Sequence, residues 1–133
     1  MAQTARGEFV VSLKPLAFEG AGPELKLGRM SIDKQISGDL TATTMGQMLS
    51  AMTSTNGSAG YVAIERVAGV LNGKRGTFVL QHTGTMNRGT PSLVVSVVPD
   101  SGTEELAGLE GEFNINIEEG RHFYEFTYRL PAQ

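Results

Sequence analysis

Apolar and polar residues alternate along most of this chain, in short stretches rich in Val, Ile, Thr, Phe and Tyr. Such alternation is typical of β-strands with one buried face, and helical periodicity is mostly absent. Glycine accounts for 17 of the 133 residues and separates the stretches at short intervals, as in strands joined by tight turns. The pattern predicts eight strands, at residues 7–14, 25–36, 39–50, 59–71, 76–86, 92–98, 109–118 and 121–130.

Three dipeptides, Ser37-Gly38, Asn72-Gly73 and Glu119-Gly120, place a glycine where a tight hairpin favours positive φ. The strands on either side of each dipeptide are therefore expected to be neighbours. A chain of this length builds one core, so residues 1–133 are expected to form a single domain. We predict an all-β fold, a single antiparallel closed barrel of about eight strands. The longest irregular segment, 15–23, is long enough to fold over one barrel mouth.

One stretch, within residues 43–54, fits two secondary structures. Four apolar residues have the i, i+3, i+4, i+7 spacing of an amphipathic helix: Met45, Met48, Leu49 and Met52. The same stretch is full of Thr, Ser and Gly, which are mediocre or poor helix formers. Strand is therefore favoured, and helix stays open.

A second stretch, beginning at Ser101, predicts one short helical turn. Ser101 is placed to cap the turn and Glu104 to reach back to it, so the turn is expected to end at about Ala107.

The hairpin around Asn72-Gly73 determines which residues share a face. A turn centred on residues 72–75 makes the numbers of paired residues sum to an odd value, such as 147. One face then holds Tyr61, Ala63, Glu65, Val67, Phe78, Leu80, His82, Gly84 and Met86. This face is bulkier, whereas the other carries Arg, Gln and three Thr, so we expect it to line the interior. A sum of 147 sets Glu65 and His82 directly opposite each other.

The same reasoning applies to the hairpin around Glu119-Gly120. It sets Phe113, Ile115 and Ile117 against His122, Tyr124, Phe126 and Tyr128, with Asn114, Asn116 and Glu125 on the other face. Five aromatic residues lie between Phe113 and Tyr128. Together with flexible methionines they favour an apolar cavity, although eight strands also leave an interior that side chains can fill completely.

Charge and composition exclude several functions. Lys and Arg total 11 against 14 Asp and Glu, a net charge of -3, and no basic block is present, which argues against nucleic acid as a partner. Because the chain has no cysteine, disulfides, thiolate nucleophiles and thiolate metal sites are excluded. The longest apolar run, 93–98, is too short for a membrane helix, and a membrane partner is not expected. The first residues show no signal-peptide pattern, so the cytoplasm is the expected location.

The residues that suggest chemistry are Glu65 and His82. A carboxylate beside an imidazole orients the ring and stabilises its protonated form, which suits general acid or base catalysis near neutral pH. The alternative is a structural hydrogen-bonded pair, extended to Arg66 or Arg29, that fixes strand register.

Two further residues complete the candidate catalytic set, His122 at a barrel mouth and Tyr124 one step deeper. His122 is placed to polarise a ligand carbonyl or to cap the rim. No His-x-His or His-x-x-x-His pair is present, so neither a metal nor another cofactor is expected. The candidate ligand-binding residues are Tyr61, Phe78, Leu80, Met86, Phe113, Phe126, Tyr128 and Arg29.

Five stretches of the chain carry a family resemblance. They are Gly28-Arg-Met-Ser-Ile-Asp-Lys, Gly60-Tyr-Val-Ala-Ile-Glu-Arg, Gly76-Thr-Phe-Val-Leu-Gln-His, Ser101-Gly-Thr-Glu-Glu-Leu-Ala-Gly and Gly120-Arg-His-Phe-Tyr-Glu-Phe-Thr-Tyr. Over nearly its whole length the chain resembles the allene-oxide-cyclase-like barrels, and within them the bacterial domain-of-unknown-function family 3224. The resemblance implies an eight-stranded antiparallel barrel, often oligomeric, whose better-known relatives cyclise an apolar, strained substrate with few catalytic groups.

Three functions fit these observations. The protein is a barrel that binds a small apolar molecule, a cyclase or isomerase that uses the Glu65 and His82 pair, or a filled barrel that acts through its outer surface. The third is favoured by the strand around Val95, where the face of Val94, Ser96 and Val98 is unusually apolar for an outer face if Leu93, Val95 and Val97 point inward. That strand also predicts a homo-oligomer.

Overall fold

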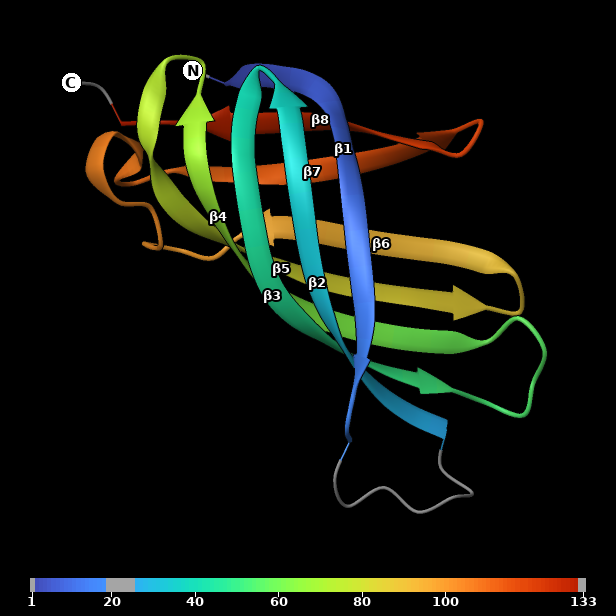
Figure 1. The fold of residues 1–133 in the computed structure, drawn as a ribbon. Helices are drawn as coiled ribbons and strands as arrows, with labels where there is room; N and C mark the ends of the chain where they lie inside the picture. Colours follow the sequence, from blue (N-terminus) through green and yellow to red (C-terminus); the bar gives the residue numbers. More distant parts are fainter. Residues whose placement is uncertain (1, 19–25, 132–133) are drawn as a thin grey trace.

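The computed structural model describes residues 2–18 and 26–131 and confirms the predicted barrel. Consecutive strands pair antiparallel, and β8 returns to β1 to close the sheet (Figure 1). The elements are β1 (Gln3–Leu16), β2 (Lys26–Gly38), β3 (Leu40–Met52), β4 (Ala59–Leu71), β5 (Lys74–Asn87), β6 (Thr90–Val97), the 3-10 helix η1 (Glu104–Leu106), β7 (Glu110–Glu118) and β8 (Arg121–Arg129). Within the described ranges no helix is long and apolar enough to cross a membrane.

Glycine conformation explains the predicted turns. Gly38, Gly73 and Gly120 have φ of 104°, 84° and 77°, a region that residues with a side chain rarely adopt. A fourth turn of the same kind, Arg88-Gly89, joins β5 to β6 and was not predicted. All three predicted hairpins are confirmed.

The stretch that fitted two structures is a strand. Residues 45–52 belong to β3, where Met48 and Met52 take the inner face and Met45 and Leu49 the outer face. The apolar spacing that resembles a helix is therefore a strand that is apolar on both faces. Of the irregular segment 15–23, residues 15 and 16 extend β1, and residues 19–23 lie outside the described part.

The predicted helical turn is confirmed, but its predicted cap is wrong. The turn begins after Thr103, and no side-chain hydrogen bond caps it. The hydroxyl of Ser101 instead accepts a hydrogen bond from the backbone N–H of Val79 at 3.0 Å. Because the Ser101 hydroxyl is hydrogen-bonded to the N–H of a strand residue, it does not cap the helical turn. Ser101 instead links the connection that precedes η1 to β5.

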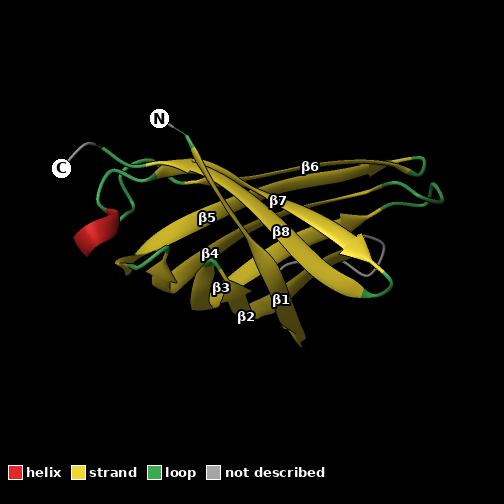
Figure 2. Cartoon of the chain, turned by 90° about the horizontal axis from the view of Figure 1, so that it is seen from above, coloured by secondary structure: helices red, strands yellow, loops and turns green. Residues whose placement is uncertain are grey.

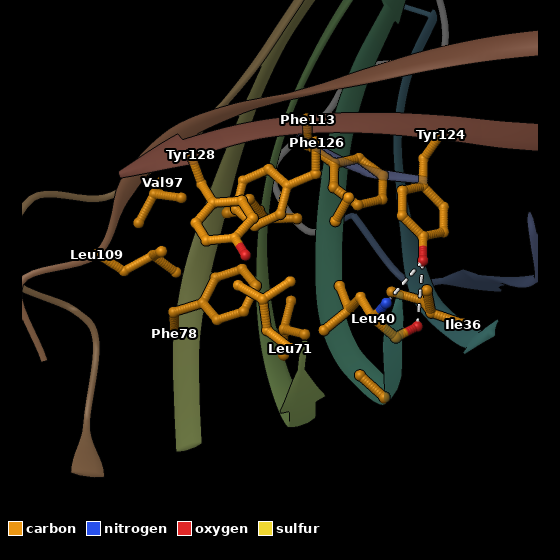
Figure 3. Close-up of a cluster of buried hydrophobic side chains, with 14 of the residues drawn as sticks. Ile36, Leu40, Leu71, Phe78, Val97, Leu109, Phe113, Tyr124, Phe126 and Tyr128 are labelled. Atoms are coloured by element: carbon orange, nitrogen blue, oxygen red, sulfur yellow. Dashed lines mark hydrogen bonds between the residues drawn. The ribbon is translucent and has the colours of Figure 1, made fainter. Parts of the chain in front are cut away.

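One end of the barrel is filled with packed side chains (Figure 3). Phe126 lies at its centre, with ring centroids 5.7 Å from Phe78, 5.7 Å from Phe113 and 5.3 Å from Tyr128. Leu106 of η1 is also buried and packs against Gly76. Several aromatic and aliphatic groups thus share one solid core.

The opposite end is open. The turns at 38 and 72–73 lie at the filled end, and the connections at 53–58, 88–89 and 119–120 lie at the other (Figure 1). Large apolar side chains on the inner face are exposed at that end: Leu13, Met52, Met86, Leu93 and Ile117. The inner surface is therefore accessible from one end of the barrel.

The barrel also has a weak seam. Strands β6 and β7 are joined by a single residue pair, Ser96 with Glu112. From that pair the two strands diverge toward the open end, as Figures 1 and 2 show from two directions.

Candidate functional site

Four polar side chains meet inside the barrel, between the filled core and the open end. Glu65 of β4 is at the centre and is fully buried, and Lys34 of β2, Thr44 of β3 and His82 of β5 surround it. Oε1 of Glu65 lies 2.8 Å from Nε2 of His82 and 3.0 Å from Nζ of Lys34. Its Oε2 accepts a hydrogen bond of 2.6 Å from the Thr44 hydroxyl. We call these four residues the ionic cluster.

The prediction that Glu65 and His82 share the inner face is confirmed, but the predicted direct pairing is wrong. In the ladder Glu65 pairs with Leu80 and His82 pairs with Ala63, so paired numbers sum to 145. The reason is a tighter turn, because two residues of positive φ, Asn72 and Gly73, connect the strands. Glu65 and His82 are diagonal neighbours whose long side chains still meet.

Lys34 was not predicted as a site residue, because Arg66 or Arg29 was expected as the cationic partner. Arg66 is exposed on the other face of β4, and Arg29 donates to the backbone oxygen of Ala17 and to the side chain of Gln47. Strand alternation could have identified Lys34, since it stands between Ile32 and Ile36 on one strand face.

Thr44 holds the ionic cluster to the sheet. The β2–β3 ladder pairs Ile32 with Gly46 and Gln35 with Thr43, but the backbone N–H of Lys34 donates to the Thr44 hydroxyl at 2.9 Å. The same hydroxyl donates to Glu65. The Thr44 side chain therefore orients the Glu65 carboxylate and takes the place of a backbone oxygen as the acceptor for the N–H of Lys34.

The electrostatics of the ionic cluster favour an ion pair. Burial raises the pKa of Glu65, but the hydrogen bond from His82, the charge of Lys34 and the Thr44 hydroxyl together outweigh burial and leave that pKa below its usual value. Burial lowers the pKa of Lys34, and Glu65 opposes that change. The Lys34 ammonium also lies over the rings of Phe9 and Phe113, 4.7 Å and 5.4 Å from their centroids.

Tyr61 extends the ionic cluster toward the open end. Its hydroxyl oxygen lies 3.2 Å from Nδ1 of His82. An ionised carboxylate only accepts hydrogen bonds, so in the neutral ring Nε2 of His82 carries the hydrogen and donates to Glu65. Nδ1 then accepts the hydrogen of Tyr61. Burial, and next the charge of Glu65, raise the pKa of Tyr61, which keeps the phenol protonated.

Tyr61 is also part of the wall of an open pocket of about 340 Å³. The pocket lies at the open end of the barrel, along strands β3 to β6. Its lining residues are Met48, Ser50, Met52, Ala59, Gly60, Tyr61, Gly84, Thr85, Met86, Pro91, Ser92 and Leu93. We call this space the mouth pocket. The described structure thus joins an apolar pocket to a buried ion pair through two side chains, Tyr61 and His82.

Gly84 determines where the Tyr61 ring lies, and we predict that Gly84→Ala breaks the Tyr61–His82 hydrogen bond. A Cβ at position 84 would stand 2.5 Å from Cε1 of Tyr61 and 3.2 Å from a methyl of Leu93. The ring must move, at a cost of about 1–3 kcal/mol in the free energy of unfolding. Nitrogen chemical shifts of the His82 ring, recorded by NMR, measure the loss.

Gly60→Ala is the matched control, because a Cβ there stands 3.7 Å from its nearest neighbour. An unchanged Nδ1 signal in Gly84→Ala would contradict the assigned role of Gly84.

Acid is expected to destabilise the fold through Glu65. A carboxyl whose folded pKa lies below its unfolded value stabilises the fold above the unfolded pKa, near 4.5, and this contribution is lost as the pH falls through the folded pKa. Urea unfolding between pH 3 and 7 should show the free energy of unfolding declining below about pH 4.5, with a shallower decline in Glu65→Gln.

The surface carboxyl of Glu8 is the control for this acid response. A hydrogen bond from Arg121 lowers the pKa of Glu8 as well, but that pair is exposed and salt screens it. A steep decline that persists in Glu65→Gln at high salt would contradict the assignment to Glu65.

The other candidate catalytic residues lie elsewhere. The ring of His122 is half-buried and packs against Phe9, with centroids 5.1 Å apart. The hydroxyl of Tyr124 accepts a hydrogen bond from the N–H of Leu40 at 3.0 Å and donates to the backbone oxygen of Ser37 at 2.8 Å. Figure 3 shows Tyr124 beside Leu40 at the edge of the solid core. Tyr124 fastens the β2–β3 turn, and its hydroxyl is occupied.

The candidate ligand-binding residues divide into three groups. Tyr61 and Met86 line the mouth pocket, and Arg29 lies on the outer face of β2. The remainder are buried in the solid core: Phe78, Leu80, Phe113, Phe126 and Tyr128. Met48, Met52 and Leu93 also line the pocket and were not among the predicted residues; strand alternation in the structure brings all three to the inner side.

Fold and site together define a small antiparallel β-barrel with a buried ionic cluster beneath an open apolar pocket. The family model described as "Protein of unknown function (DUF3224)" matches residues 5–128. The chain therefore belongs to the DUF3224 family, as the sequence resemblance predicted.

A solved structure from the same family has the same fold. It is the crystal structure of a protein with unknown function from Shewanella oneidensis MR-1, with 48% sequence identity, 100% coverage of both chains and a TM-score of 0.94. None of the curated proteins matches the chain.

Proposed function

We propose that this barrel holds a small apolar or amphipathic molecule in its mouth pocket and acts on it as a cyclase or isomerase. The observation that carries the proposal is the chain of contacts from Tyr61, on the pocket wall, through His82 to Glu65. A buried ion pair gives little net stability, because the cost of removing two charges from water offsets their attraction, so a chemical role accounts better than stability for Glu65 beneath the pocket.

The proposed chemistry moves a proton and no other group. The bound molecule gives a proton from an acidic C–H group or from a hydroxyl to the oxygen of Tyr61. At the same time the phenol proton of Tyr61 passes to Nδ1 of His82. Glu65 stabilises the imidazolium that forms. In an isomerisation, the proton returns by the same route to another atom of the molecule as a double bond shifts. In a ring closure, the deprotonated oxygen forms a bond to an unsaturated carbon of the same molecule, and the π electrons of that carbon's double bond take up the returning proton, so neither reaction needs an oxidant or a cofactor.

The mouth pocket supports the binding half of the proposal. Met48, Met52 and Met86 contribute flexible thioether side chains that can adapt to an apolar guest. A volume near 340 Å³ lies at the small end of the range for ligand pockets.

Binding is tested with the neutral dye Nile red. We expect its fluorescence to rise on binding to the wild-type protein, and Met86→Glu to weaken the dye's affinity at least about tenfold, because it places a carboxylate in the pocket. Val10→Glu is the control, since Val10 is exposed and on the outer face of β1. Equal affinity in all three proteins would overturn the binding proposal.

Chemistry is tested by proton exchange with solvent. The probe is 1-hydroxydecan-2-one in D₂O, with deuterium entry at the carbon between hydroxyl and carbonyl followed by NMR. We expect the wild-type protein to accelerate exchange about a hundredfold or more over buffer. Tyr61→Phe and His82→Gln should return the exchange rate to the background rate in buffer. Both variants should remain folded under the assay conditions, which urea unfolding verifies. Exchange that survives both substitutions would overturn the catalytic role.

A second candidate function, self-association without chemistry, is favoured by the outer face of the barrel. Val62 and Ile64 of β4 are about half exposed. Thr83 of β5 pairs with Val62 on one side and with Val94 of β6 on the other, so these residues share one row across the outer face. A second copy of this chain would cover such a patch. We expect Ile64→Lys to lower the mass in solution, measured by light scattering, and Val10→Lys to leave it unchanged. A monomeric wild-type protein would overturn this candidate.

A further inference from the structure

The mouth pocket restricts which molecules it accepts. Among its twelve lining residues none is charged, and the polar side chains that belong to the inner face are those of Ser50 and Tyr61, whereas Thr85 and Ser92 pair with each other on the outer face. A carboxylate bound there would have no cation in the described wall to pair with, and burying an unpaired anion is strongly unfavourable.

The cations near the pocket do not change this conclusion. Lys34 is almost fully buried, and its ammonium contacts Glu65, with His82 on the same carboxylate oxygen. Its charge is therefore balanced inside the ionic cluster. Lys26 begins β2 opposite Met52 at the rim, but it is exposed and does not line the pocket.

The direction of the Tyr61 hydrogen bond restricts the ligand further. When the neutral His82 ring carries its hydrogen on Nε2 and donates it to Glu65, the phenol gives its only hydrogen to Nδ1, so the lone pairs of the phenol oxygen can only accept. A ligand hydroxyl is the group that matches, because it donates to Tyr61 at the pocket wall. An ether or an ester oxygen at the same place has no hydrogen to give.

From these observations we infer that the mouth pocket selects a neutral apolar alcohol, whose hydroxyl donates to the oxygen of Tyr61, and rejects a carboxylate of the same length. This inference rests on the proposed function and names its ligand class. The hydroxyl hydrogen then lies at the start of the route to His82 and Glu65.

Three matched probes test the inference: decan-1-ol, methyl decyl ether and decanoate, each measured by displacement of Nile red at pH 7.5. We expect the ether to bind about three- to tenfold more weakly than the alcohol, the range of one hydrogen bond, and decanoate at least about thirtyfold more weakly. In Tyr61→Phe the difference between alcohol and ether should disappear. In Lys26→Met the ranking should be unchanged.

The outcomes separate the ligand class from the pocket. Decanoate binding as tightly as decan-1-ol would overturn the inference and leave the proposed binding function standing, and loss of that decanoate binding in Lys26→Met would identify the rim lysine as its partner. Equal alcohol and ether affinities in the wild-type protein would overturn the role of Tyr61 as acceptor. If no probe displaces Nile red, the inference fails together with the proposed function.

Discussion

Replacing Glu65 with leucine is expected to lower the free energy of unfolding by about 3–5 kcal/mol. The substitution leaves the Lys34 ammonium in an apolar interior without its carboxylate, and both side chains are nearly inaccessible to water. It also removes the acceptor of His82 Nε2 and of the Thr44 hydroxyl. Urea unfolding at pH 7, followed by circular dichroism, measures the change.

A double variant separates a broken ion pair from lost packing. Lys34→Met combined with Glu65→Leu removes both charges and is expected to recover more than half of the stability that Glu65→Leu loses, because a buried pair replaced by apolar groups is often neutral. Glu8→Leu removes an exposed partner of Arg121 and should leave the midpoint nearly unchanged. A double variant no more stable than the single one would contradict this account.

If the double variant folds well, stability alone does not explain the ionic cluster. The same protein can then be assayed for proton exchange with 1-hydroxydecan-2-one. Loss of exchange in a stable double variant would support the view that the charges serve the chemistry of Tyr61 and His82.

The second large effect is expected in the solid core, where Phe126→Ala should lower the free energy of unfolding by about 3–5 kcal/mol. Phe126 is fully buried and contacts three other rings, so its removal leaves a cavity that rigid aromatic neighbours cannot fill. Urea unfolding gives the value directly.

Ile117→Ala is the control for this effect. Ile117 also belongs to the inner face, but at the open end it is 62% exposed, so its loss should change stability by less than about 1 kcal/mol. A similar loss in both variants would mean that the two ends of the barrel are equally packed, which would contradict the distinction between a solid core and an open mouth.

The sequence contains most of the information that sets the strands and their faces. Alternation is local, and a glycine of positive φ such as Gly73 or Gly120 marks a hairpin, so the inner face of β4, β5, β7 and β8 could be derived from turns alone. The offset between Glu65 and His82 could not be derived in this way. A two-residue turn and a four-residue turn put the same residues on the inner face, but the strand pairing that they give differs by two positions.

The candidate site was predicted only in part, because the burial of a charged residue depends on contacts that are distant in the sequence. A charged residue on a strand is ordinarily exposed, so Lys34 was not predicted to be buried. Its burial depends on Glu65, which lies 31 residues away. The aromatic residues near the C-terminus were expected to line a cavity, yet Phe113 and Phe126 belong to the filled end. Which end of a barrel is filled follows from how all the strands pack together, and no local pattern encodes it.

The single pair between β6 and β7 divides the barrel into parts of unequal rigidity. Elsewhere the strands are joined by long ladders, but beyond Ser96 and Glu112 the facing edges of β6 and β7 share no described ladder pair. Amide hydrogens along those edges should exchange with solvent long before those of β4 and β5, since a local opening there breaks few bonds. Such an opening is lateral and adjoins Val95, the neighbour of His82 in the β5–β6 ladder. If the barrel holds a guest as proposed, separation of β6 from β7 would be a second way in beside the mouth, and a guest too bulky for the mouth would enter and leave no faster than the two strands separate.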